Sequence, residues 1–274
     1  MQIINVNAPP DCNYYLWGDS HEGNVAQADG EVDKLILTIQ NDPIGRTSTM
    51  GDLLEAFWLD DPRYDIETTK DPPLKQKNQM KDKLSCIQSK IDTMLMGNHC
   101  RKLLNKVGNI MEDLCNDLKI QYGTYTAKIE FSDGYKFYIT HGSRPINSIS
   151  PDPIRRQAYM EFILKRHLED KAGDCVVMAK GHAHKLLVSS PLPQLYLTTK
   201  KGKIRKNYTK PGSGKDPFIP PENRYYCCTG SFLRSQMVGV STYSEMAEYA
   251  PIEIGYILIE IRDKKVANVK KVVV

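Results

Sequence analysis

The sequence predicts a single α/β domain, in which two packed β-sheets carry helices on their outer faces. A length of 274 residues favours one large domain over a string of modules, because domains typically contain about 150 residues. Hydrophobic residues make up 41% of the chain and charged residues 26%, which is typical of a globular protein. Helix-like and strand-like segments alternate in the first half, whereas strand-like runs dominate the second half. This pattern favours helices packed outside two sheets, all within residues 1–274.

In the first half, apolar spacings of three and four residues indicate helices, and short apolar runs indicate buried strands. The Ser-Asp-Gly triplet at 132–134 lies between two strand-like runs and predicts a β-hairpin. In chain order, we expect an apolar run at 35–39 before a turn at 41–43, a helix face at 80–91, a strand at 91–96, a helix at 103–118, and hairpin strands at 125–131 and 135–140.

In the second half, the sequence predicts one more helix, followed by strands. Pro153 at the start and Gly173 as a C-terminal stop predict a helix over 154–171. A buried strand is expected directly after it, at 175–179. The later strand-like runs are 186–190, 194–199, 224–230, 254–262 and 271–274.

The composition also excludes some classes of protein. No run approaches the roughly 18 apolar residues of a membrane helix, and the N-terminal stretch lacks the basic head and apolar core of a secretion signal. The seven cysteines are odd in number and form no C-x-x-C motif, which indicates reduced thiols. We therefore expect a soluble, cytoplasmic protein with no membrane partner, whose oligomeric state stays open.

Positive charge gathers in one segment. The chain has a net charge of +4, but Lys200–Lys215 carries seven basic residues and no acid, so the rest sums to −3. Glycines and a proline mark this segment as a loop or an open hairpin tip. It is either a solvated loop or a contact for a phosphate backbone, with Tyr208 as a stacking group. The basic candidates for substrate binding are Lys203, Arg205 and Lys206.

Five short motifs carry the candidate chemistry, and each follows a strand-like run or a loop just past one. Residues i and i+2 of an extended segment point to the same side, about 6.6 Å apart, so D-x-H and H-x-H pairs can converge on one ion or on two neighbouring ions. Carboxylate, imidazole and amide oxygen ligands together are typical of Mn, Fe or Zn sites. The motifs are Gly18-Asp19-Ser20-His21, Gly51-Asp52, Gly97-Asn98-His99, His141-Gly142 and Gly181-His182-Ala183-His184.

The order of these motifs resembles that of the calcineurin-like metallophosphoesterase superfamily, whose pattern is D-x-H, G-D, G-N-H followed by an acid, H, and G-H-x-H. The resemblance spans residues 19 to 184, and residues 227–235 are similar to a T-G-S strand that often follows. The overall style also resembles small phosphoesterases encoded by bacteriophages. The resemblance implies two mixed sheets in a four-layer α/β/β/α sandwich and a site for two divalent metal ions, with Mn as the expected ion and Fe or Zn as alternatives.

The resemblance also implies a role for each motif residue. Asp52 would bridge the two metals, and His99 would face the substrate phosphate without binding metal. The sequence departs from the pattern at Cys100, where an acid is expected, which affects how His99 is oriented. An insertion around 60–90 is expected near the mouth of the site. The first metal would be held by Asp19, His21 and His184, and the second by Asn98, His141 and His182.

We therefore expect a metal-dependent hydrolase of phosphate esters. Two cations can activate a bridging water as hydroxide for in-line attack on phosphorus. His99 is the expected general acid, and Arg144 is a candidate partner of the phosphate. A phosphodiester, including nucleotides or nucleic acid, is favoured because His99 can protonate a poor leaving group. The alternatives are a phosphomonoesterase or protein phosphatase, and a non-catalytic nucleic-acid-binding module on the same fold; a closed structural zinc site would instead contain more cysteine.

Overall fold

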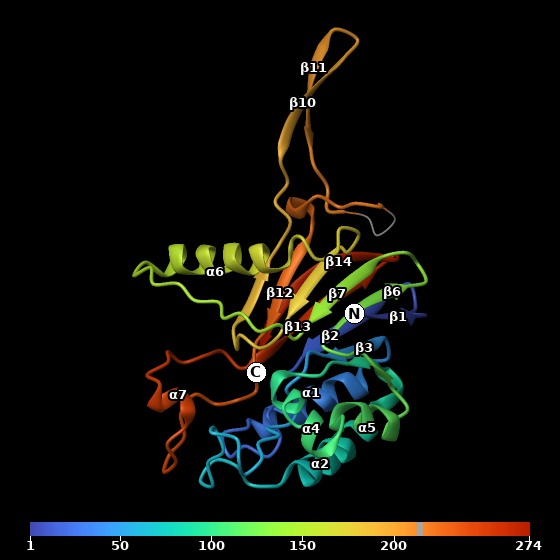
Figure 1. Cartoon of the computed structure of the whole chain (residues 1–274). Helices are drawn as coiled ribbons and strands as arrows, with labels where there is room; N and C mark the ends of the chain where they lie inside the picture. Colours follow the sequence, from blue (N-terminus) through green and yellow to red (C-terminus); the bar gives the residue numbers. More distant parts are fainter. Residues whose placement is uncertain (213–215) are drawn as a thin grey trace.

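Two six-stranded mixed sheets lie face to face at the centre of the protein (Figure 1). This computed structural model describes residues 1–212 and 216–274. The first sheet consists, in spatial order, of β1 (Gln2–Val6), β6 (Thr126–Phe131), β7 (Lys136–Thr140), β8 (Val177–Lys180), β12 (Tyr225–Thr229) and β9 (Leu186–Ser189). The second consists of β14 (Lys265–Val273), β13 (Gly255–Arg262), β2 (Cys12–Trp17), β3 (Gly45–Thr49), β4 (Ile91–Met94) and β5 (Gln121–Tyr122).

Both sheets combine parallel and antiparallel pairs. Strands β2, β3, β4 and β5 run parallel, and β13 joins β2 in the antiparallel direction. In the other sheet, β7, β8 and β12 run parallel. Parallel strands place their C-terminal ends at the same edge of a sheet, so the segments that follow them lie close together.

Helices cover the outer face of each sheet. On β2, Tyr14 and Leu16 point into the core between the sheets, while Tyr15 and Trp17 point to the helical side, as the two-residue period of a strand requires. On the opposite outer face, Leu164 and other residues pack against the first sheet. The helices are α1 (Asp29–Asn41), α2 (Pro73–Ser85), η1 (Gln88–Lys90), α3 (Asn98–Arg101), α4 (Leu104–Val107), α5 (Ile110–Asp117), α6 (Pro153–Leu168), η2 (Pro221–Asn223) and α7 (Tyr243–Met246).

The predicted fold class is therefore confirmed, with two differences among the elements. The apolar run at 35–39 belongs to α1, whose buried residues face the sheet. The expected helix at 103–118 is wrong as a single element, because the chain breaks between α4 and α5 at Gly108. Gly108 has φ +82°, a backbone conformation that a helix cannot contain and that glycine adopts readily.

The basic segment forms the tip of a projecting hairpin. Strands β10 (Leu195–Lys200) and β11 (Lys203–Tyr208) pair only with each other and extend away from the sandwich (Figure 1). Every residue of β10 is exposed, as are nearly all of β11. Residues 213–215 of the basic segment lie outside the described residues.

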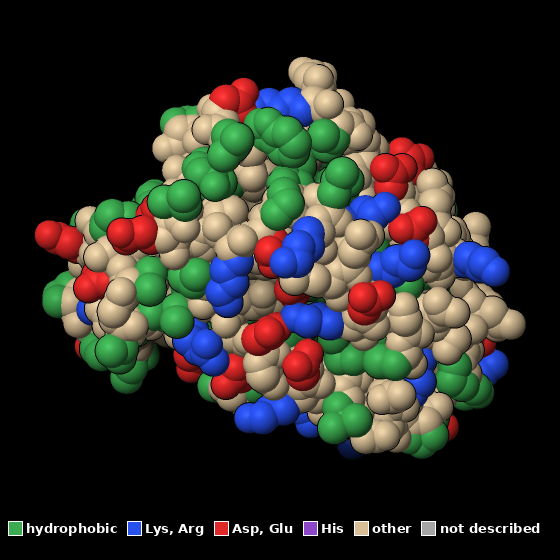
Figure 2. All heavy atoms as spheres, turned by 90° about the horizontal axis from the view of Figure 1, so that it is seen from below, with side chains coloured by type: hydrophobic (Ala, Val, Ile, Leu, Met, Phe, Trp, Pro, Cys, Tyr) green, Lys and Arg blue, Asp and Glu red, His purple; other side chains and the backbone are tan. Residues whose placement is uncertain are grey.

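Charges elsewhere are more evenly distributed. On the face seen from below Figure 1, lysine and arginine side chains are interspersed with acidic ones (Figure 2). All seven cysteines are free, and six of them are buried. Among the described residues, no helix is both long and apolar enough to cross a membrane.

Candidate metal centre

The five predicted motifs meet at one end of the sandwich, because each directly follows the C-terminal end of a strand. Asp19 follows β2, Asp52 follows β3 and Asn98 follows β4 in one sheet. His141 follows β7 and His182 follows β8 in the other sheet. The parallel direction of these strands thus gathers residues that lie up to 165 positions apart in the chain.

The motif backbones are not extended, contrary to the expectation from sequence. Asp19, His21, Asp52, His182 and His184 all have φ between +47° and +64°. Side chains other than glycine rarely adopt this left-handed conformation, and it concentrates at functional sites where the surrounding structure enforces it. These five side chains therefore converge because the backbone turns sharply at each of them, and the two-residue period of a strand does not explain their convergence.

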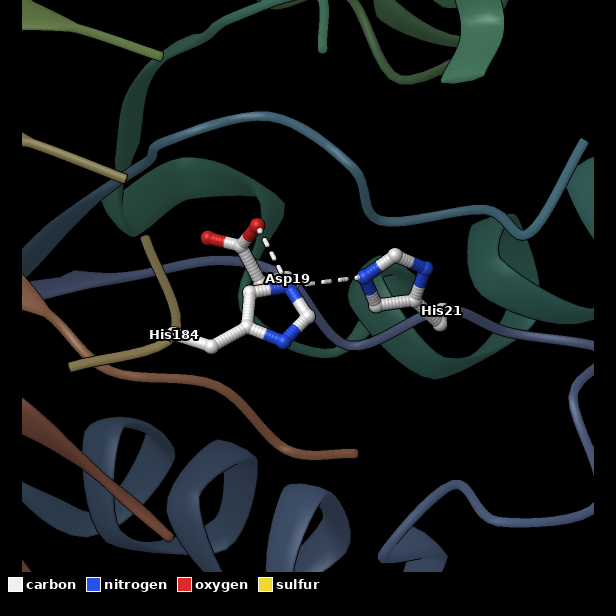
Figure 3. Close-up of side chains that lie close together, drawn as sticks. All are labelled: Asp19, His21 and His184. Atoms are coloured by element: carbon white, nitrogen blue, oxygen red, sulfur yellow. Dashed lines mark hydrogen bonds and ion pairs between the residues drawn. The ribbon is translucent and has the colours of Figure 1, made fainter. Parts of the chain in front are cut away.

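The first cluster joins Asp19, His21 and His184 (Figure 3). The two histidine Nε2 atoms lie 3.4 Å apart, and His184 Nε2 lies 3.3 Å from Asp19 Oδ1. His21 directs its other ring nitrogen, Nδ1, to the Glu55 carboxylate at 2.8 Å. Such a contact holds Nδ1 as the protonated nitrogen and leaves the Nε2 lone pair free for a cation.

The second cluster joins Asp52, His141 and His182, with Asn98 beside it. His141 Nε2 lies 3.1 Å from Asp52 Oδ2 and 3.0 Å from Asn98 Oδ1, while its Nδ1–H donates to the Met50 carbonyl at 2.8 Å. Asp52 also forms a third group with His21 and His99. It therefore lies between the two clusters.

These donors fit divalent cations. Asp19 Oδ1 is buried and accepts no hydrogen bond, which is costly for a carboxylate unless a cation binds it. In the second cluster, His141 Nε2 faces two oxygen atoms, so this position requires positive charge, either a proton or a metal. Imidazole and carboxylate groups within 4.8 Å of one another suit Mn, Fe or Zn.

The charges of the second cluster support the same conclusion. Burial raises the pKa of Asp52, but His141 and His99 hold it well below its usual value. Burial lowers the pKa of His141, but the Asp52 carboxylate outweighs this and raises it to about 9. Burial and the neighbouring His141 lower the pKa of His182 to about 4. Asp52 is thus ionised and His182 neutral near pH 7, which are the forms that bind metals, whereas His141, with its raised pKa, would release a proton when a metal binds.

His99 is oriented without the acid expected after it. Its Nδ1–H donates to the backbone carbonyl of Glu55 at 2.7 Å, and its backbone N–H donates to Asp52 Oδ1 at 3.0 Å. The ring stacks on Phe57 at 4.5 Å. Cys100 is fully buried in the core between helices and sheet. The Glu55 carbonyl and Phe57 thus orient the ring although Cys100 stands where an acid was expected, and Nε2 of His99 faces the cavity, 3.4 Å from Arg63 Nη1.

Glu55 is a residue that the sequence motifs did not reveal. Its carboxylate contacts His21 Nδ1 and accepts a hydrogen bond from Asn24 Nδ2 at 2.9 Å. Its side chain is almost completely buried. The only signal in the sequence is its place three residues after Asp52, and a lone acid at that spacing does not indicate a ligand partner.

A cavity of about 430 Å³ opens above the clusters. One wall comes from residues between 57 and 68, part of which belongs to the segment that the sequence predicts to be an insertion. The opposite wall comes from residues 233–246, which include α7. Arg63 lines the first wall and was also missed from the sequence, because nothing links it to a motif.

The basic candidates from the sequence lie elsewhere. Arg144 is exposed and is not among the residues that line this cavity, although its backbone carbonyl accepts a hydrogen bond from Lys180 Nζ at 2.6 Å. Lys203, Arg205 and Lys206 lie on β11. The hairpin leaves the sheet where β9 ends, next to the start of β12, whereas the metal centre lies at the other end of these strands.

No protein-family model and no curated protein sequence matches the chain. Among solved structures, nuclease MPE of Pseudomonas putida aligns over 94% of this chain and 87% of its own, with 12% identity and a TM-score of 0.35. The NAD nucleotidase NadN of Haemophilus influenzae aligns over 95% of this chain, which spans 49% of that protein, with 11% identity and a TM-score of 0.41.

A third similar structure is a protein serine/threonine phosphatase from Saccharomyces cerevisiae with similarity to human phosphatase PP5. It covers 66% of this chain and 64% of its own, with 14% identity and a TM-score of 0.31. All three TM-scores lie below 0.5, so function has to be argued from the residues of the site.

Proposed function

We propose that the protein hydrolyses phosphate esters with the help of two divalent cations. The observation that carries this proposal is the row of three ligand groups that share His21 and Asp52 at the floor of one cavity. Asp19, His21 and His184 would hold one cation. The second would be held by Asn98, His141 and His182, with Asp52 shared between the two.

Bound cations of this kind supply a Lewis acid and an activated water for attack on phosphorus. The protein residues then have to position the ester and donate a proton to the leaving oxygen. His99 can take the second task in its imidazolium form, in which Nδ1–H is held by the Glu55 carbonyl and Nε2–H faces the cavity; burial lowers the pKa of this ring, so the acidic form has to be favoured by the bound phosphate. A positioned general acid contributes roughly 10²–10⁴-fold to the rate.

The proposed leaving group is an alkoxide, which requires protonation and is found in phosphodiesters as well as in alkyl phosphomonoesters. We favour diesters because the basic hairpin in addition offers a place for a polyanion, and we propose Mn as the cation. A phosphomonoesterase uses the same ligands, so a direct comparison of the two substrate classes is part of the test.

The test combines metal content with turnover. Purified protein is analysed for bound metals and assayed with added Mn on an alkyl phosphomonoester and on the matching dialkyl phosphodiester, whose leaving groups are alkoxides. His99→Ala should retain the metals and lose 10²–10⁴-fold in kcat on substrates with alkoxide leaving groups. His167→Ala, on α6, is the matched control. A His99→Ala protein with bound metal and full activity, or a wild type with neither metal nor turnover, would overturn the proposal.

The hairpin supports a second candidate function, binding of nucleic acid. Between Leu195 and Lys210 it has six basic residues and no acid, in contrast to the mixed charges of the underside (Figure 2). A two-stranded β-ribbon fits the major groove of DNA. Lys203→Ala/Arg205→Ala/Lys206→Ala should weaken duplex binding and flatten its salt dependence. Equal binding by the wild type and this variant would remove the idea.

A further inference from the structure

We propose that Arg63 binds the phosphoryl group of the substrate in the cavity and positions it beside His99. The proposal rests on the proposed phosphoesterase function, and it adds a phosphate-binding subsite supplied by the insertion. The guanidinium of Arg63 lines the cavity, and its Nη1 lies 3.4 Å from His99 Nε2.

The guanidinium is held in place by two neighbours. Its Nε and Nη2 atoms donate to the two oxygens of Asp61, both at 3.1 Å. Its Cζ atom lies 4.3 Å above the centre of the Phe57 ring, which in turn stacks on His99. Carboxylate pairing and cation–π contact together fix both the plane and the direction of the group, so little side-chain entropy is left to lose when an anion binds.

This arrangement leaves one edge of the guanidinium available. Asp61 uses the Nε/Nη2 edge, so the Nη1/Nη2 edge remains for a second partner, and Nη1 lies 3.4 Å from His99 Nε2. Two parallel N–H donors match two oxygens of a phosphate. A phosphoryl group on this edge would lie next to the nitrogen that we propose to protonate the leaving oxygen.

The charges around Arg63 are mixed, because residues 57–68 carry four acidic side chains and Arg63 is their one basic residue. Lys102 Nζ also donates to Asp61, at 3.3 Å from Oδ2, so two basic side chains share one carboxylate. Arg234 lies on the opposite wall, and both of its terminal nitrogens already have partners. Nη1 donates to the Gln27 carbonyl and Nη2 to the Glu31 carboxylate. Of these two arginines, Arg63 is the one directed at His99.

The test uses inorganic phosphate as a probe, so that binding is measured apart from catalysis. Calorimetry with Mn-loaded protein should show that Arg63→Ala weakens phosphate binding 10- to 100-fold, as expected for charged hydrogen bonds. Arg63→Lys, which keeps the charge but not the fork, should fall between wild type and Arg63→Ala. Arg155→Ala, an exposed arginine on α6, is the matched control. If Arg63→Ala does not fold, Arg63→Met keeps an apolar stem over Phe57 and carries the test.

Turnover provides the second measurement. Loss of a phosphate contact made in both the ground state and the transition state should raise KM with a smaller change in kcat. Phosphate affinity in Arg63→Ala equal to that of Arg155→Ala, or a loss seen in Arg144→Ala instead, would overturn the assignment. A wild type that binds phosphate through Arg63 but turns over no ester would contradict the proposed function and leave the subsite standing.

Discussion

The Nε2 atoms of His21 and His184 lie 3.4 Å apart, although 163 positions separate the two residues in the chain. Glu55 lies at the opposite ring nitrogen of His21, so this Nε2 carries its lone pair toward His184. Two facing nitrogen atoms beside a buried carboxylate are unfavourable unless a cation lies between them.

Divalent cations should stabilise the fold. Binding to the native state at 100 times Kd contributes about 2.7 kcal/mol. For a protein of this size, that corresponds to a rise in Tm of roughly 5–10 °C. Thermal melts with Mn and with a chelator measure this shift. Asp19→Asn should lose most of it, and an equal shift in the variant would show that the ions bind elsewhere.

Glu55→Gln should weaken metal binding, because the carboxylate that orients His21 loses its charge. Changes in such supporting groups typically cost 10–100-fold in metal affinity. The measurement is a calorimetric titration of the metal-free protein with Mn. Glu67→Gln, an exposed change of the same kind twelve residues further along the chain, serves as the control. Unaltered affinity in the Glu55 variant would contradict its role at His21.

Gly97→Ala should disrupt the centre through its backbone. A Cβ atom at this position would lie 1.9 Å from Asp52 Oδ1 and 2.3 Å from the Asp52 backbone nitrogen. Asp52 would have to move, so Mn affinity and Tm should both fall. Gly30→Ala, in α1, has no atom within 4 Å of the added Cβ and should be neutral or slightly stabilising. Identical behaviour of the two variants would refute this account.

Cys100→Asp introduces the acid that the motif resemblance leads us to expect at this position, and it should destabilise this protein. Cys100 has no exposed surface and packs among apolar residues of the helical core, where burial raises the pKa of its thiol well above the usual value. An unpaired buried carboxylate costs about 3 kcal/mol or more. Urea unfolding measures the change, with Cys100→Ala as the control. Unchanged stability with higher turnover would show that the pocket accepts the acid.

Acid should weaken the fold through Asp174. Burial raises its pKa, but Lys128 and Lys136, whose Nζ atoms lie at 2.7 and 2.8 Å, lower it to about 2. A pKa below the unfolded value of about 3.9 stabilises the native state above that pH, and the contribution disappears between pH 4 and 2. Solvent screening reduces it to about 1 kcal/mol.

Asp174→Asn should therefore lower the free energy of unfolding at pH 7 by about 1 kcal/mol and reduce the pH dependence between 4 and 2. Urea unfolding of both proteins at a series of pH values measures this. Asp33→Asn, an exposed change on α1, is the comparison. Parallel pH profiles for wild type and Asp174→Asn would contradict the prediction.

Much of the fold could be predicted from local patterns. The hairpin of β6 and β7, the helix α6 after Pro153 and the strand-rich second half all follow from apolar periodicity and turn residues, which act over a few neighbouring positions. The break at Gly108 was missed, because the apolar spacing continues across it while the backbone does not.

The sequence by itself determined which ligand types the protein carries and the order in which they follow its strands, because motif spacing is a property of the chain. Only the tertiary structure decided how they meet. The left-handed turns at Asp19 and His184, and the contact of Glu55 with His21, depend on strands brought together from distant segments. The same holds for Arg63, which reaches His99 across 36 positions, whereas the basic hairpin projects from the other end of the sheet. Long-range packing sets these relationships, and no local pattern records them.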